Sequence, residues 1–244
     1  MSETTPSSVC DLPLPPPDLR MNSPAQREDD IYRRSAVGLV RAVQAVLGAE
    51  RFSIHRRVRA ELPEMRVLDL GCGTARFLHG LVAARQSPKS YVGIDVQADQ
   101  IAWCRKTLAP LGAFQFHHIN VKNDRYNPSG TDTIEGRVPF PNAEADFIML
   151  RSVLTHMRTQ EAERTLKELR RCLAPGGRLY ATANVAHGAP IWTDLPNDRG
   201  VTSTLLKVQF NKAYFETMLE ETGFRVSIFC ESIENQCVYL LRPA

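Results

Sequence analysis

Short apolar runs, rich in β-branched and aliphatic residues, alternate with helical patterns over most of the chain. These runs are Met65 to Leu70, Tyr91 to Asp95, Phe114 to Ile119, Asp146 to Leu150 and Arg178 to Thr182. Strands that alternate with helices predict a parallel sheet, because each parallel connection needs a crossover, usually a helix. We therefore expect a doubly wound α/β fold, with helices on both faces of the sheet.

Two amphipathic helices stand out beside this pattern. In residues 29–48 the apolar positions recur every three or four residues, and Gly48 stands where a helix commonly ends. This segment predicts an N-terminal capping helix. The second helix follows the fourth strand, with Thr159 as its N-cap, an apolar stripe through Leu166 and Leu169, and basic residues in its last turn.

The C-terminal part of the chain predicts one more helix and a pair of strands. Asn211 can cap a helix that runs through Thr222, and Gly223 would end it. Residues 224–230 and 236–242 then have the composition of two adjacent strands that could pair as a hairpin.

Two segments lack a periodic pattern. Residues 1–27 are rich in proline, serine and threonine, and we expect a disordered tail because this composition buries too little apolar surface to offset chain entropy. Residues 127–145 hold several Gly and Pro residues and predict a long loop, of a kind that is often functional. The expected division is therefore a tail at 1–27, a helical cap at 28–62 and a binding domain at 63–244.

Composition and charge limit the classes of function. Of the 244 residues 43% are hydrophobic, and 30 Lys and Arg against 27 Asp and Glu leave a formal net charge of +3. This small charge gives no reason to expect a nucleic-acid or membrane partner. The sequence has neither a long apolar run nor the pattern of a secretory signal, so we expect a soluble, cytoplasmic protein.

The spacing of potential metal ligands does not suggest a metal site. The six cysteines form no CxxC pair, which argues against a zinc cluster and against a disulfide framework. His117 and His118 are adjacent on a predicted strand, so their side chains would point to opposite faces. We expect no metal.

The most informative segment is a strand that runs into a glycine turn, residues 67–73 (VLDLGCG). Glycine lets a backbone approach a ligand closely. Asp95 ends the next strand about twenty residues later, at the spacing from which an acid reaches ribose hydroxyls. Arg76 replaces the third glycine of the dinucleotide pattern, which disfavours a pyrophosphate and therefore NAD or FAD. The segment predicts a site for a nucleoside without phosphates.

These residues resemble the first motif and the second-strand acid of the class I S-adenosylmethionine-dependent methyltransferases, over about residues 63–242. The resemblance implies a Rossmann-like, seven-stranded, mostly parallel sheet whose last strand is antiparallel. It implies S-adenosylmethionine as cofactor and S-adenosylhomocysteine as product. Residues 126–130, 138–141 and 152–157 are similar to a bacterial subgroup of these enzymes whose substrates are diverse.

The resemblance also implies which residues contact the cofactor. It assigns Gly71 and Gly73 to the methionine and ribose portions, Asp69 to the organisation of the turn, and Asp95 to the ribose diol. The other candidates lie in the turn, beside the adenine or near the sulfur: Cys72, Val96, Gln97, Asn120, Val121 and Ser152. Asn120 stands where the family commonly has an acid, and Asn123 is the alternative contact for the adenine amino group.

Methyl transfer demands little chemistry of the protein, because a sulfonium is already a good methyl donor. The protein has to align the acceptor with the methyl carbon and exclude water. An acceptor hydroxyl or protonated amine must also lose a proton, and His156 and His187 are the candidate bases. For each histidine a purely structural role is the alternative. Trp192 and Asp194 are candidate contacts for the acceptor.

We expect a methyltransferase that acts on an oxygen or nitrogen atom of a small molecule, with secondary metabolism as one setting. Methylation of a peptide or protein, and a module that binds S-adenosylmethionine without catalysis, are the alternatives. After the fourth strand the chain has LRSV in place of the Asp/Asn-Pro-Pro-aromatic sequence of base methyltransferases, which counts against a nucleic-acid acceptor. Specificity is expected to reside in the N-terminal helix and in residues 187–210.

Overall fold

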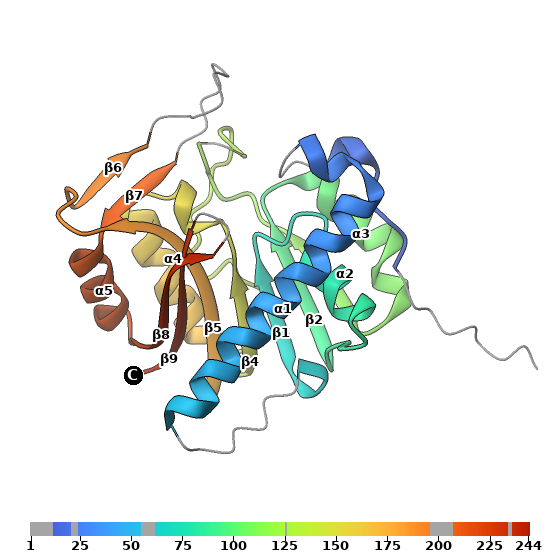
Figure 1. Ribbon diagram of the computed structural model, residues 1–244. Coiled ribbons are helices and arrows are strands. Elements are labelled where there is room, and N and C mark those ends of the chain that lie inside the picture. The colour runs from blue at the N-terminus through green and yellow to red at the C-terminus, as the bar shows by residue number, and fades with distance from the viewer. Residues whose placement is uncertain (1–11, 21–23, 55–61, 125, 196–206, 234–235) are drawn as a thin grey trace, which may run out of the picture.

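The computed structural model describes residues 12–20, 24–54, 62–124, 126–195, 207–233 and 236–244 (Figure 1). Its strands are β1 (Arg66–Leu70), β2 (Ser90–Asp95), β3 (Phe114–His118), β4 (Ala145–Leu150), β5 (Leu173–Ala186), β6 (Trp192–Asp194), β7 (Val208–Asn211), β8 (Phe224–Ile233) and β9 (Gln236–Pro243). The strands β3-β2-β1-β4-β5 pair in parallel in this order. The last strand, β9, is antiparallel to both β5 and β8. The predicted seven-stranded, mostly parallel sheet is confirmed.

Two short strands extend this sheet where a loop was expected. β7 pairs in parallel with the far end of β5, and β6 pairs antiparallel with β7. β6 lies within residues 187–210, and β7 begins there and ends one residue later, at Asn211; residues 196–206 are outside the described residues. The extension is possible because β5 is 14 residues long and continues past the end of its pairing with β9.

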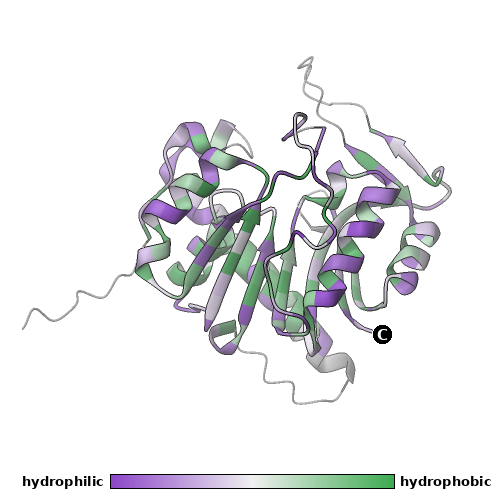
Figure 2. Ribbon diagram, turned by 180° about the vertical axis from the view of Figure 1, so that it is seen from behind, coloured by the Kyte–Doolittle hydropathy of each residue, from purple (hydrophilic) through white to green (hydrophobic). Residues whose placement is uncertain are grey.

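Helices cover both faces of the sheet. α1 (Asp29–Ile54), α2 (Arg76–Ala83) and α3 (Ala98–Thr107) pack on one face, and α1 lies diagonally across it (Figure 1). α4 (Thr159–Cys172) and α5 (Lys212–Glu221) pack on the other face. Seen from behind, the central strands are largely hydrophobic and the helices turn hydrophilic residues outward (Figure 2). The sheet is thus buried between two helical layers, as parallel sheets are.

The N-terminal helix is longer than its sequence pattern predicts. Gly48 lies inside α1 and does not end it, because buried contacts continue beyond that point. Glu50 is 3% exposed and accepts hydrogen bonds of 2.7 Å from Nε of Arg178 in β5. At the other end of α1, a Cβ on Gly80 of α2 would lie 2.1 Å from the carbonyl oxygen of Ala36. Only glycine allows α1 and α2 to pack this closely.

Part of the predicted disordered tail is ordered, which corrects the expectation for residues 12–20 and 24–27. Leu12 is buried and belongs to the hydrophobic cluster that includes residues of α1, α2 and α3. Arg20 is 4% exposed and donates hydrogen bonds to the carbonyl oxygens of Pro15 (2.8 Å) and Arg27 (2.9 Å) and to Asp29 (2.7 Å). One buried guanidinium therefore holds a proline-rich segment that has few hydrogen bonds of its own.

The ends of the C-terminal helices agree with the sequence patterns except at one cap. The side chain of Asn211 accepts a hydrogen bond from the Tyr214 N–H, so the predicted cap of α5 is confirmed. For α4 the N-cap is Arg158 and not Thr159, and the Arg158 N–H donates to Glu161. This backbone hydrogen bond satisfies a helix-end donor without a hydroxyl cap.

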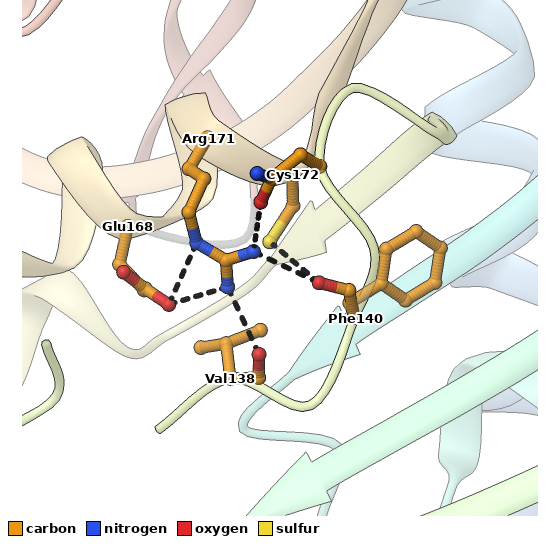
Figure 3. Close-up of polar contacts among 6 residues, drawn as sticks. Val138, Phe140, Glu168, Arg171 and Cys172 are labelled. Atoms are coloured by element: carbon orange, nitrogen blue, oxygen red, sulfur yellow. Dashed lines mark hydrogen bonds and ion pairs between the residues drawn. The ribbon is translucent and has the colours of Figure 1, made fainter. Parts of the chain in front are cut away.

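The long loop before β4 is present and is anchored by Arg171 of α4. Its guanidinium donates to the carbonyl oxygens of Val138 (2.9 Å) and Phe140 (2.9 Å) (Figure 3). It also donates to the side chain of Asn142 (2.6 Å). Glu168, which is 7% exposed, pairs with the same guanidinium at 2.5 Å. Because Arg171 satisfies these backbone carbonyls, the loop can pack against the sheet without secondary structure of its own.

Candidate functional site

A cavity opens at the carboxyl ends of β1, β2 and β4, which is where ligands bind in open α/β sheets. Its walls come from the glycine turn, the segments that follow β2, β3 and β4, α1, and the N-terminal segment. They include Leu19, Leu39, Asp69, Gly71, Cys72, Gly73, Arg76, Phe77, Asp95, Val96, Gln97, Gln100, Ile119, Val121, Asn123, Tyr126, Ile134, Met149, Arg151, Ser152, Val153, His156 and Met157. Most of the candidate residues therefore share one cavity.

The turn after β1 depends on its two glycines. Gly71 and Gly73 have φ angles of 79° and 56°, in the left-handed region that favours glycine. A Cβ on Gly71 would also lie 2.3 Å from Cγ2 of Val153, which follows β4. The backbone of the turn consequently forms part of the cavity wall without side chains to obstruct it.

Asp95 is fixed against this turn. Its Oδ2 accepts a hydrogen bond of 2.8 Å from the Gly73 N–H, and its Oδ1 accepts one of 2.9 Å from the Gln97 N–H. Burial raises the pKa of this carboxyl, and the backbone hydrogen bonds partly offset that rise. Each carboxylate oxygen has a further lone pair for a ligand hydroxyl.

Asp69 lies below the turn, where it is 4% exposed and borders the cavity. It accepts a hydrogen bond from the Tyr91 hydroxyl. Burial is the main cause that raises the pKa of Asp69, to about 7, and the charge of Asp95 adds to it. The two strand-end carboxyls thus differ in environment, because Asp95 has two backbone donors and Asp69 has a single phenol.

The comparisons with known proteins agree with this geometry. A family model described as "Methyltransferase domain" matches residues 48–227. The chain belongs to the class I S-adenosylmethionine-dependent methyltransferases. It is 28% identical over 142 residues to the fatty-acid O-methyltransferase of Mycolicibacterium smegmatis, covering 55% of this chain and 43% of that protein. The chain spans less than half the length of the curated relatives it matches.

Solved structures share the fold of this methyltransferase at low sequence identity. An S-adenosylmethionine-dependent methyltransferase from Mesorhizobium loti has a TM-score of 0.54 at 16% identity, covering 81% of this chain and 99% of that one. The 1,6-didemethyltoxoflavin-N1-methyltransferase of Burkholderia thailandensis, with 1,6-didemethyltoxoflavin and S-adenosylhomocysteine bound, has a TM-score of 0.52 at 13% identity, covering 88% of this chain and 80% of that one. Within the described residues no helix is both long and apolar enough to cross a membrane.

The residues predicted to flank the adenine divide into two groups. Val96, Gln97 and Val121 line the cavity, whereas Asn120 is not among its lining residues. The Asn120 side chain is exposed and bonded within its own loop, where it donates to Thr131 (3.2 Å) and accepts from Asn127 (3.1 Å). Asn123, the alternative, is 8% exposed and lines the cavity. The structure therefore brings Asn123, and not Asn120, to the site.

The two candidate bases of the methyltransferase also differ in position. His156 lies in a short 3-10 helix after β4, Leu154–His156, where it is 7% exposed and lines the cavity. Its ring meets the ring of Tyr126 edge to face, with centroids 5.6 Å apart. His187 is exposed in the turn after β5 and does not line the cavity. Only His156 is placed where a bound acceptor could reach it.

Ser152 and Cys72 line the cavity in different ways. Ser152 has a φ of 57°, and its N–H donates to the Thr182 hydroxyl at 2.8 Å, so the strained conformation is held by β5. Its own hydroxyl donates to Gln236 at 3.1 Å. Burial raises the pKa of the Cys72 thiol well above its ordinary value, which disfavours the thiolate that a nucleophilic cysteine needs.

Trp192 and Asp194 are not among the residues that line this cavity. Both face Arg158, whose guanidinium carbon lies 5.2 Å from the centre of the Trp192 ring and whose Nη2 lies 3.8 Å from Asp194. Neither residue is therefore a first contact for an acceptor in the cavity.

No group of three or more His, Cys, Asp or Glu side chains in the described ranges is placed to hold a metal ion.

Sequence reasoning missed two arginines of the cavity. Arg76, the first residue of α2, is 8% exposed, and Arg151 directly follows β4. From the sequence, Arg76 is interpreted only as the residue that replaces the third glycine of the dinucleotide pattern. The position of Arg151 at the carboxyl end of a central strand was the available signal for the second residue.

Proposed function

We propose that this methyltransferase moves a methyl group from S-adenosylmethionine to an oxygen or nitrogen atom of a small molecule that has an apolar body. The observation that carries the proposal is the Asp95 carboxylate, held by the N–H groups of Gly73 and Gln97 at the wall of a cavity whose other walls are largely apolar. A nucleoside and an apolar acceptor can share such a cavity.

The residues around Asp95 suit the cofactor. Asp95 would accept hydrogen bonds from the ribose hydroxyls, and the side chains of Val96, Ile119 and Val121 would pack against the adenine. Gly71 and Gly73 leave room for the methionine portion beside the turn. The cofactor, when bound, supplies a methyl group on a positively charged sulfur. The chain itself then has to position the acceptor and keep water out.

The acceptor side of the cavity lies near the segment after β4. His156 is the group that would take a proton from an acceptor hydroxyl or amine, and its contact with Tyr126 holds the ring in place. Ile134, Val153 and Met157 supply apolar surface next to it. The relative from Mycolicibacterium smegmatis is named for an apolar acceptor, a fatty acid, which supports an apolar body for the acceptor here as well.

The proposal is tested by binding and turnover in matched variants. S-adenosylhomocysteine should raise the melting temperature of the wild type, and NAD should not. Asp95→Ala should weaken S-adenosylhomocysteine binding about 100-fold, since it removes a charge-assisted contact to the ribose. Asp99→Ala, a change at an exposed acid on α3, is the control and should bind as the wild type does.

Turnover separates the catalytic part of the proposal from the binding part. With a panel of apolar alcohols, amines and acids as acceptors, His156→Ala should lower kcat about 100-fold for alcohols and amines and leave S-adenosylhomocysteine affinity unchanged. Wild-type affinity in Asp95→Ala would overturn the ribose assignment. Binding without methylation of any acceptor in the panel would contradict the proposed reaction.

A further inference from the structure

Arg76 is a buried cation that has no close anionic partner among the described residues. Its side chain extends beneath α1, and the residue is 8% exposed. To the residues that the structure describes, the guanidinium makes one hydrogen bond, a long one of 3.5 Å from Nη1 to the Ser35 hydroxyl. Within the described part of the chain no carboxylate oxygen lies within 4.0 Å of it. A guanidinium has five N–H donors, so most of its capacity is unused by the protein.

The other buried arginines show how this chain normally satisfies such a group. Arg178 donates to Glu50 at 2.7 Å and also to two backbone carbonyl oxygens. Arg20 pairs with Asp29 at 2.7 Å and donates to three carbonyl oxygens. A buried charge without a partner costs roughly several kcal/mol, and Arg178 and Arg20 avoid this cost because each has a carboxylate partner. The exception, Arg76, is the one that lines the cavity.

Arg151 increases the positive charge at the same place. It lines the same cavity, and burial together with the nearby charge of Arg76 lowers the pKa of Arg151 to about 10. Asp69 is the acid whose charge acts on both arginines. Its own charge is incomplete at neutral pH, because burial raises the pKa of Asp69 to about 7. Asp95 lines the same cavity but is not among the charges that act on either arginine, so Asp69 is the cavity acid nearest to them in effect.

The geometry points to a carboxylate-binding site on the cavity floor, formed by Arg76 with Arg151 beside it. The planar guanidinium presents paired N–H groups that match the two oxygens of a carboxylate. A carboxylate has two possible sources: the methionine part of the cofactor, which rests on the proposed function, or an acid acceptor. Because both sources offer the same group, Arg76 is the residue to test first.

The test is isothermal titration calorimetry of the full chain as wild type, Arg76→Gln, Arg76→Lys and Arg164→Gln. Arg164 is about half exposed on α4 and pairs with Glu135, so its variant is the matched control outside the cavity. The probes are S-adenosylhomocysteine, which has the carboxylate, and 5′-methylthioadenosine, which has the same nucleoside without the amino-acid part. Decanoate, an apolar acid, is titrated with and without S-adenosylhomocysteine present.

Each source predicts a different pattern. If the cofactor supplies the carboxylate, Arg76→Gln weakens S-adenosylhomocysteine about 10- to 100-fold and leaves 5′-methylthioadenosine unchanged. If the acceptor supplies it, decanoate loses affinity by a similar factor and both nucleosides bind as before. Arg76→Lys keeps the charge but not the planar fork, and should show an intermediate loss. Unchanged 5′-methylthioadenosine binding also shows that the variant is folded.

One result overturns the inference. Wild-type affinity of Arg76→Gln for S-adenosylhomocysteine, with decanoate either unaffected by the change or not bound by any form, means that Arg76 binds no carboxylate. Failure of the proposed function looks different, because the wild type itself would then bind neither nucleoside. The ligand-free variants add a further check: Arg76→Gln should melt no lower than Arg164→Gln, since it removes a buried charge that has no close counter-charge.

Discussion

The two faces of the sheet treat buried charge differently. On the face beneath α1, α2 and α3, four buried ionisable groups have no opposite charge within 4.0 Å among the described residues: Asp69, Arg76, His79 and Asp95. The same face also holds paired buried charges, Glu50 with Arg178 and Arg20 with Asp29, both at 2.7 Å. On the face beneath α4 and α5 the core is apolar, and its buried acid, Glu168, pairs with Arg171 at 2.5 Å. An unpaired charge lowers stability unless a ligand pairs with it, so the first face is built for binding and the second for stability.

Asp69→Asn should show the largest effect, and it acts on the binding face. In the folded protein the pKa of Asp69 is about 7 and its ordinary value is 3.8, a difference worth about 4 kcal/mol. Below about pH 4 Asp69 is protonated in the folded and in the unfolded protein, and it does not lower the stability of the wild type. As the pH rises to about 7, the unfolded protein ionises Asp69 more readily than the folded protein does, so the free energy of unfolding falls. Asn cannot ionise, so the variant should gain up to about 4 kcal/mol on the wild type between pH 4 and pH 8.

Urea unfolding of both proteins at each pH measures this difference. Burial lowers the pKa of His79 to about 4, which makes stability rise between about pH 4 and 6.5. That contribution is present in both proteins and cancels when they are compared. His79→Asn is the control variant, and it should remove the opposite slope. Parallel stability curves for wild type and Asp69→Asn would show that Asp69 is charged in the fold throughout this range.

The sequence patterns predicted the part of the site that depends on neighbouring strands. Gly71, Gly73 and Asp95 belong to one strand–turn–helix–strand unit, so their spacing along the chain determines their spacing in the fold. Asn120 and Asn123 lie three residues apart in a loop, and no periodicity indicates which of them turns toward the cavity. Hydrogen bonds within the loop decide it: the Asn120 side chain donates to Thr131 and accepts from Asn127, and these partners follow from the folded loop alone.

The unpaired charge of Arg76 could not be predicted, because it depends on contacts between distant segments. α1 covers this residue only because Gly80 lets the two helices pack closely. The order of residues 12–20 has a similar origin, since Arg20 is buried against α1 and its 3-10 neighbours. The proline-rich composition of this segment suggests disorder. It does not reveal that a single arginine satisfies its carbonyl oxygens.

Arg171→Gln acts on the stability face and should show an intermediate effect. The variant loses the hydrogen bonds to Val138 and Phe140 and leaves Glu168 buried without its partner. We expect the free energy of unfolding to fall by about 2 kcal/mol, and S-adenosylhomocysteine affinity to stay within about twofold of the wild type. Unfolding curves and calorimetry on one preparation measure both quantities. A variant that kept its stability but lost cofactor affinity would break the division between the faces.

The smallest change in the free energy of unfolding is expected from replacing either of two alanines that share an unfavourable backbone conformation. Ala75, next to the glycine turn, has a φ of 60°, and Ala143, in the loop before β4, has a φ of 53°. A left-handed backbone conformation costs a non-glycine residue about 1–2 kcal/mol, and glycine removes this cost. Glycine also increases the conformational entropy of the unfolded chain, which lowers stability by about 0.4–1 kcal/mol and offsets part of the gain. Ala143 is exposed, so Ala143→Gly should raise the free energy of unfolding by about 0.5–1 kcal/mol.

Ala75 is fully buried, so Ala75→Gly also loses a packed methyl group, worth about 0.8 kcal/mol. Its net effect should therefore be close to zero, although the backbone angle is nearly the same as that of Ala143. Chemical denaturation of the two variants beside the wild type measures the difference. Equal stabilisation at both positions would mean that the Ala75 methyl group contributes nothing, and that the turn on the binding face is packed as loosely as the exposed loop. A difference of about 0.8 kcal/mol would show that this face is tightly packed at its turn, although Asp69 and Arg76 near the turn have no ion pair among the described residues.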